Sequence, residues 1–247
     1  MTTETALNSY MDAILANCRQ YWLNYSNVHC SNEHITSYQT GVPHPQLNGV
    51  IRMREAAAVE KIPLIVSQLS GRPSVWWIGP DSYPAASDDL VDAGARLIGK
   101  VPVMAVQLED LRPPAKLAGN VSIERLEGGE ELGSWVQCYS EPMGVAAEDF
   151  AVMLHAEQNR SDASGQLTRF AARSEGEIVG TSELFVHDNV AGVYLVTTKN
   201  SHRRLGIGTA LTQAAAVAGL ELGLKIGTLQ ASSSGYPVCT KKWDLMT

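Results

Sequence analysis

The sequence predicts an α/β protein built of two successive domains. Hydrophobic patterns typical of strands and of helices alternate along the chain. The pair Pro113-Pro114 interrupts this alternation near the middle, where neither a helix nor a strand tolerates it well. A glycine-containing loop at residues 203–208 joins a strand to an alanine-rich helix. We therefore expect one domain at residues 1–115 and a second at residues 120–247.

The first half reads as a smaller α/β domain that supports the second or contributes to its substrate side. Its hydrophobic runs have lengths and spacings typical of short helices and strands. The elements expected are a helix near 5–25, an apolar segment at 48–53, a helix near 57–69, a strand at 75–78, a helix near 87–93 and a strand at 103–108.

The second half reads as a single mixed sheet with helices. The elements expected are a strand at 121–126, helices near 130–139 and 147–158, strands at 167–173, 178–186 and 193–198, a helix from 207 to 222 and a strand at 225–231. In the helix from 207, six apolar residues fall at three- and four-residue spacing and predict one face that lies on the sheet. They are Ile207, Leu211, Ala214, Ala215, Ala218 and Leu222.

Composition and charge exclude several classes of protein. The formal net charge of −7 disfavours nucleic acid as a partner, because duplex binding depends on clustered lysine and arginine. No apolar run approaches the roughly 18 residues of a membrane-spanning helix, so no membrane partner is expected. The amino terminus has acidic residues and no basic segment, so no secretory signal is indicated and a cytoplasmic location is expected.

Cysteine and histidine patterns give no sign of a metal site. Cys18, Cys30, Cys138 and Cys239 are scattered, as expected of reduced thiols rather than of a disulfide or zinc framework. The six histidines form no metal-binding pair. We assign no residue to a metal.

The loop Arg203-Arg204-Leu205-Gly206-Ile207-Gly208 is the most informative part of the chain. Glycines let the backbone turn sharply, and the amino end of a helix offers unpaired N–H groups to an anion. The Gly-Lys-Ser/Thr ending of a P-loop is missing, which disfavours nucleotide hydrolysis. Leu211 stands where a dinucleotide fold needs a small residue, which disfavours nicotinamide binding. A glycine turn without a ligand remains the alternative.

With its flanking strand and helix, this loop resembles the acetyl-CoA-binding motif of the GNAT superfamily of N-acetyltransferases, Arg/Gln-x-x-Gly-x-Gly/Ala. The resemblance covers roughly residues 120–238. It implies a mixed, splayed β-sheet flanked by helices, preceded by a smaller related α/β domain. The first half resembles a degenerate second copy, as in tandem members, but it has no such loop. The second half stops at Thr247, before the last strands of the family pattern, so we expect the first domain or another subunit to cover the open sheet edge.

The resemblance also implies where acetyl-CoA binds as cosubstrate. The backbone N–H of Val196 meets the thioester oxygen, and the strand there binds the pantetheine arm through main-chain groups. The loop takes the pyrophosphate mostly through its backbone, although a solvated Arg204 without such a role is an alternative. The residues implied are Val196, Thr197, Thr198, Arg203, Arg204, Leu205, Gly206, Ile207, Gly208, Thr209 and Ser232.

Two residues are expected to move protons. A protonated amine must lose a proton to attack the thioester, and Glu183, central in the strand beside the motif strand, is the candidate base. A solvent-facing glutamate without a catalytic role is the alternative. In the family a tyrosine protonates the departing thiolate. Ala231, Ser232 and Gly235 match the pattern around it, but Cys239 stands in the tyrosine position, which puts catalytic competence in doubt.

Two functions therefore compete. The first is an N-acetyltransferase that moves an acetyl group from acetyl-CoA to a primary amine of a small molecule or peptide. The second is a non-catalytic acyl-CoA-binding or scaffold protein that kept the loop and lost the acid. The acceptor is not indicated by the sequence, and a homodimer is left open.

Overall fold

The computed structural model describes residues 9–26, 28–69, 71–111, 117, 120–232, 235 and 244–245. The chain divides into two compact units that interleave along the sequence. The first comprises residues 1–18, 101–144 and 162–247, and the second comprises residues 19–100 and 145–161. The predicted boundary at 115–120 falls largely on residues outside the described ranges and stays a prediction. No helix within those ranges is both long and apolar enough to cross a membrane.

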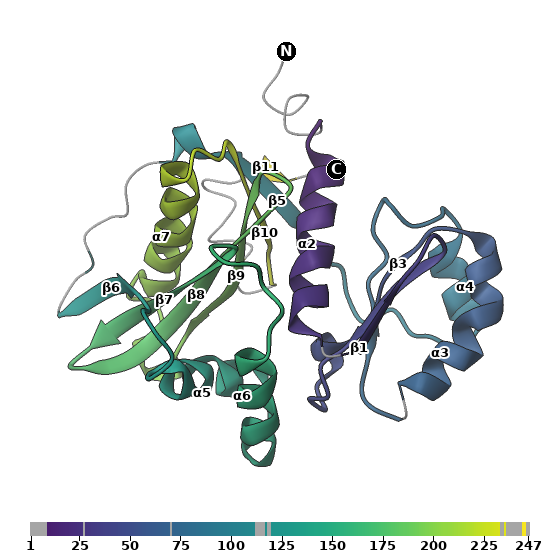
Figure 1. Cartoon of the computed structure of the whole chain (residues 1–247), viewed down its shortest axis with the longest axis horizontal. Coiled ribbons are helices and arrows are strands. Elements are labelled where there is room, and N and C mark those ends of the chain that lie inside the picture. Colours follow the sequence, from purple (N-terminus) through teal and green to yellow (C-terminus); the bar gives the residue numbers. More distant parts are fainter. Residues whose placement is uncertain are drawn as a thin grey trace. The chain divides into compact units, whose positions relative to one another are not determined.

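The first unit is a mixed seven-stranded sheet in the order β11-β5-β10-β9-β8-β7-β6 (Figure 1). Only β9 and β10 pair in parallel, and the other neighbours are antiparallel. The strands are β5 (Val103–Gln107), β6 (Val121–Arg125), β7 (Leu167–Ser174), β8 (Glu177–His187), β9 (Val190–Thr198), β10 (Ile226–Gln230) and β11 (Asp244–Leu245). This is the mixed sheet flanked by helices that the sequence predicted.

Two helices pack on opposite faces of this sheet. Along β8 the side chains alternate between faces. Ser182 donates a hydrogen bond from Oγ to the carbonyl oxygen of Leu211 in α7 (Ile207–Glu221), at 3.1 Å. Its neighbour Glu183 points the other way, toward Arg169, whose guanidinium lies over the ring of Trp135 in α5 (Leu132–Met143).

Small residues let α7 approach the sheet closely. A Cβ at Gly219 would lie 2.6 Å from Cβ of Ala191, and one at Gly180 would lie 2.9 Å from Cδ1 of Leu211. The predicted apolar face of α7 is confirmed for Ile207, Leu211, Ala215 and Ala218, which are buried. Leu222 is the exception at 60% exposure, because the helix ends at Glu221 and the chain turns away at Gly223, whose φ is +81°.

The edge of β10 is covered by a strand from the first half of the chain. β5 pairs antiparallel with β10, from Ile226↔Gln107 to Gln230↔Val103, and β11 pairs with the other side of β5. Thr228 also donates from Oγ1 to the carbonyl oxygen of Met104 at 3.0 Å. The expectation that the first half would cover this edge is confirmed, and the sheet core draws on β5 as well as on β7–β10.

The second unit has a four-stranded mixed sheet in the order β1-β2-β3-β4. A Cβ at Gly49 in β3 would lie 1.8 Å from the carbonyl oxygen of Val75 in β4, so these strands need glycine there. Two separate sheets fit a tandem-like arrangement. The elements are β1 (Val28–Ser31), β2 (Ile35–Gln39), β3 (Asn48–Met53), β4 (Val75–Trp76), α3 (Ile62–Gln68), α4 (Ala86–Asp92) and α6 (Phe150–Gln158); α2 (Met11–Tyr25) contributes to both units.

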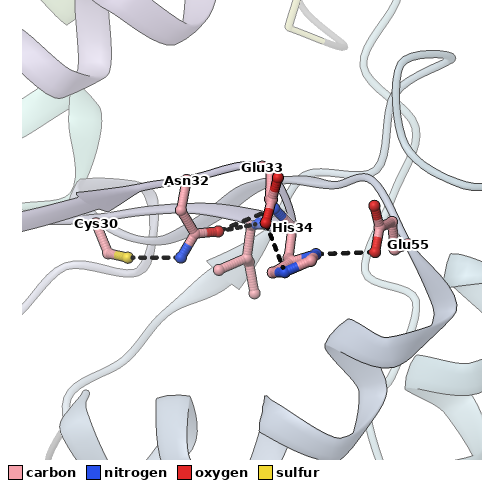
Figure 2. A network of polar contacts seen from close by, with 6 residues as sticks. Cys30, Asn32, Glu33, His34 and Glu55 are labelled. Carbon is pink, nitrogen blue, oxygen red and sulfur yellow. Dashed lines mark hydrogen bonds and ion pairs between the residues drawn. The ribbon is translucent and has the colours of Figure 1, made fainter.

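The turn between β1 and β2 is held by a polar network (Figure 2). The Asn32 Oδ1 atom accepts hydrogen bonds from the backbone N–H groups of His34 and Ile35, both at 2.9 Å. The His34 ring lies between Glu33 and Glu55, with Nδ1 2.8 Å from Oε2 of Glu55. Because these contacts close a hairpin at the surface, we assign them a local structural role.

Candidate active site

The glycine loop lies where the sequence predicted it, at the amino end of α7. The helix begins at Ile207, as predicted, and Gly206 is its N-cap. No side chain caps this end, and the first intrahelical bond runs from the N–H of Ala210 to the carbonyl of Gly206 at 3.0 Å. The amides of the first turn are therefore available to an anion.

Backbone conformation shapes the loop before the helix. Arg204 and Gly206 have φ of +66° and +80°, whereas Arg203 has φ of −68°. Such alternation bends successive amides toward one concave side, as in anion-binding nests. Only glycine adopts positive φ without cost, so Arg204 indicates that the surrounding structure holds this turn in place.

Gly208 leaves space beside β9. A Cβ built there would have Oγ1 of Thr198 as its nearest neighbour, at 3.7 Å, with no atom closer. The missing side chain therefore opens the gap between the loop and the strand, where a phosphate group could approach the amides. Ile207 is buried and anchors the turn, whereas the other predicted loop residues are exposed or half-buried: Arg203, Arg204, Leu205, Gly206, Gly208 and Thr209.

The motif strand β9 diverges from β10 after its first residues. Their pairing ends at Thr228↔Gly192, after which Leu229 and Gln230 of β10 pair only with β5. Within the described residues, β9 from Val193 to Thr198 has β8 as its sole strand partner. The free edge of β9 can thus accept an extended ligand through main-chain hydrogen bonds, as an added strand would.

A β-bulge interrupts β9 at this divergence. The register with β8 shifts between Glu183↔Tyr194 and Thr181↔Thr197, so that Leu195 and Val196 together oppose Ser182. Leu195 has φ of +46°. A bulge disrupts the ladder locally and re-aims the strand. Val196 is exposed, and Thr197 and Thr198 are half-buried, so the predicted strand residues are reachable from solvent.

Glu183 is buried, so the solvent-facing alternative is wrong. Its side chain is 0% exposed, and Oε1 lies 3.3 Å from Nε of Arg169. Arg169 is its cross-strand partner in β7 and Tyr194 its partner in β9, which puts the carboxylate on the strand pair that carries the bulge. The guanidinium of Arg169 thus lies beside the buried carboxylate and offsets its charge.

Asn17 in α2 holds the bulged strand from the same face as Glu183. Its Oδ1 accepts a hydrogen bond from the Tyr194 hydroxyl at 2.8 Å. Its Nδ2 lies 2.9 Å from the carbonyl oxygen of Val190 and 3.2 Å from those of Phe185 and His187. Sequence reasoning missed Asn17, because a lone asparagine in a helix carries no signal of such a role.

The residues after β10 are only partly described. Ser232 is exposed, and its Oγ accepts a hydrogen bond from the N–H of Gly235 at 3.1 Å. Cys239, the candidate acid, lies outside the described residues. Within the described part of the chain, no group of three or more histidine, cysteine or acidic side chains could hold a metal ion.

Comparison with known proteins gives one family match. Residues 131–235 match the acetyltransferase (GNAT) family, and this segment runs from α5 through the glycine loop to β10. The match covers residues 131–235, and this segment is similar to GNAT acetyltransferases in sequence. No curated protein sequence matches the chain.

Solved structures share the fold at low sequence identity. A GCN5-related N-acetyltransferase from Kribbella flavida aligns over 100% of this chain and 93% of its own, with a TM-score of 0.66 and 18% identity. A conserved protein of unknown function from Staphylococcus epidermidis aligns over 87% of this chain and 88% of its own, with a TM-score of 0.61 and 12% identity. At these identities the likeness concerns the fold alone.

Proposed function

We propose that this protein is an N-acetyltransferase that moves an acetyl group from acetyl-CoA to a primary amine of a small molecule or peptide. The observation that carries the proposal is the pairing of a free, bulged edge on β9 with an uncapped glycine loop at the start of α7. Few ligands other than CoA combine an extended amide arm with a pyrophosphate.

In this proposal the cosubstrate is bound mainly by backbone groups, with positive charge from two arginine side chains. Amides of Gly206 to Thr209 receive the pyrophosphate, and the exposed Arg203 and Arg204 add positive charge beside it. The edge of β9 at Thr197 and Thr198 pairs with the amide arm. The N–H of Val196 meets the thioester oxygen, where it also stabilises the negative charge that develops during attack. Ser232, exposed two residues after β10, is the last proposed contact of the cosubstrate.

Chemistry requires a deprotonated amine and a way for the thiolate to leave. The amine nitrogen forms a bond to the thioester carbon while the carbon–sulfur bond breaks, and the proton lost by the amine passes to Glu183. Because Glu183 is buried beside Arg169, we propose that ordered water carries this proton. Cys239 is the proposed donor to the departing thiolate, which is itself a better leaving group than an alkoxide.

The test is release of CoA thiol with a panel of primary amines. We expect thiol release that depends on both acetyl-CoA and amine, and we expect Glu183→Gln to lower the rate and to remove the acidic limb of the pH profile, where protonation stops a carboxylate from acting as a base. Glu177→Gln, the same change at an exposed glutamate of β8, is the matched control and should retain most activity. If the protein is instead an acyl-CoA-binding scaffold, acetyl-CoA should raise its melting temperature, but no amine should cause release of CoA thiol.

A further inference from the structure

The bulge in β9 needs support, because it stores backbone strain. Leu195 adopts φ of +46°, a region that is unfavourable for a residue with a side chain. Such a conformation persists only where neighbouring groups hold it. The ladder with β8 is interrupted at this point, so fewer regular backbone hydrogen bonds hold Leu195 in this conformation.

A buried threonine on β8 supplies this support. Thr181 is 0% exposed, and its Oγ1 donates a hydrogen bond to the carbonyl oxygen of Leu195 at 2.8 Å. The same Oγ1 lies 2.7 Å from Oγ1 of Thr197. A hydroxyl has one hydrogen, and a carbonyl oxygen only accepts. Since the Thr181 hydrogen goes to Leu195, the hydrogen between the two hydroxyls must come from Thr197.

The two bonds form a directed chain from Thr197 through Thr181 to the Leu195 carbonyl. It joins the residues on both sides of Val196 to one point on β8. It also turns the Thr197 hydroxyl toward β8, so that this residue offers a ligand its backbone rather than its hydroxyl proton. The position of the Val196 backbone is thereby set from both neighbours.

We propose that Thr181 is a positioning residue for acetyl transfer: its hydroxyl fixes the bulge so that the N–H of Val196 meets the thioester oxygen. This rests on the proposed function, but it makes a separate claim. Thr181 does not touch the cosubstrate and acts through Leu195 and Thr197. Its loss should therefore affect the acetyl end of the ligand and leave the pyrophosphate end, held by the loop at the start of α7, nearly unchanged.

The substitution Thr181→Val keeps the shape and removes the hydroxyl, and Thr181→Ser keeps the hydroxyl. For Thr181→Val we expect kcat to fall about tenfold or more, since small misplacements at a reacting centre have such effects. The KM for acetyl-CoA should change less than about threefold, and Thr181→Ser should restore most of kcat. The matched control is Thr228→Val, which removes another buried hydroxyl–carbonyl bond of the same sheet and should leave kcat unchanged.

A spectroscopic readout needs no acceptor. In amide NMR spectra of the full chain, acetyl-CoA should shift the Val196 N–H signal more than CoA does, because only acetyl-CoA carries a thioester oxygen. This difference should vanish in Thr181→Val and persist in Thr181→Ser and Thr228→Val. Should Thr181→Val not fold, Thr181→Ala, which leaves room beside the Leu195 carbonyl, serves the same comparison.

The outcomes separate the two proposals. An acetyl-dependent shift that Thr181→Val retains, with kcat intact and only stability lowered, overturns the positioning role and leaves the proposed function standing. A shift that Thr181→Val abolishes, in a protein that releases no thiol with any amine, supports the positioning role and overturns the N-acetyltransferase. No acetyl-dependent shift in the wild-type protein overturns the positioning role, even where CoA binds.

Discussion

At the scale of single residues, buried polar groups fix the geometry of the site. Asn17 forms hydrogen bonds with one hydroxyl and three carbonyl groups around the start of β9. It also lies close to the backbone there, since a Cβ at Gly192 would be 2.2 Å from its Oδ1. Buried polar groups cost roughly 1–3 kcal/mol each when left unpaired. These contacts therefore hold the first residues of β9 in place, whereas its free edge begins at Val193.

The buried thiol of Cys138 in α5 makes stability depend on pH. Burial raises its pKa to about 11 from an ordinary value of 9.0, and the positive charge of Lys199 opposes this only in part. The raised pKa favours the neutral thiol in the folded state. Its contribution is thus complete below about pH 9 and is lost as the pH rises toward 11, since the unfolded chain ionises first.

The expected result is a difference between two pH profiles. From pH 9 to pH 11 the free energy of unfolding of the wild-type protein should fall by about 2 kcal/mol more than that of Cys138→Ala, as measured by urea titration. Cys30→Ala, at an exposed thiol, is the control and should follow the wild-type profile. Parallel profiles for wild type and Cys138→Ala would show that the thiol ionises equally in both states.

At the scale of elements, the place of β5 in the sheet does not follow from the order of elements along the chain. It precedes the predicted boundary, yet it pairs with β10 and accepts a hydrogen bond from Thr228. Pro102, the residue before β5, accepts one from the backbone N–H of Ala231. An unpaired β10 would expose a row of backbone groups and the apolar side chains beneath them.

We therefore expect the predicted domain 120–247 to need β5. A fragment of residues 101–247 should be more soluble and unfold more cooperatively in urea than a fragment of residues 120–247. The two differ by β5 and the segment after it, so both keep the glycine loop and α7. Equal solubility and cooperativity would instead support a domain that begins at residue 120 and is complete without the strand.

Most elements of the second half were predictable because they have strong hydrophobic periodicity and end at glycine or polar turns. The strands at 167–174 and 177–187 and the helix from 207 agree with the prediction within a few residues. The hairpin β1–β2 was missed, because β1 is exposed along its whole length and shows no alternation. The bulge at Leu195 was missed as well, since an ordinary leucine gives no sign of a positive φ.

At the scale of the whole molecule, the sequence predicted what lies close together along the chain and missed what folding brings together. The loop from Arg203 to Thr209 and the strand before it are contiguous, so a local motif found them. Asn17 and Thr181 reach β9 from distant parts of the sequence, and β5 crosses the apparent boundary. The burial of Glu183 depends on Arg169 and α5, which no pattern within β8 reveals.

The central claim is that the gap between the loop and β9 holds CoA, and Gly208 tests it most directly. Its φ is not in the positive region, and a Cβ there meets nothing within 3.7 Å, so Gly208→Val should fold normally while filling the gap. Gly206 is less suitable, because its φ of +80° makes any substitution strained.

The measurement is isothermal titration calorimetry of CoA with the wild-type protein and with Gly208→Val, alongside their melting temperatures. We predict saturable heat from the wild-type protein, an affinity reduced more than about tenfold in Gly208→Val, and similar melting temperatures without ligand. No heat from the wild-type protein at millimolar CoA, or equal affinity in a folded Gly208→Val, would contradict the account.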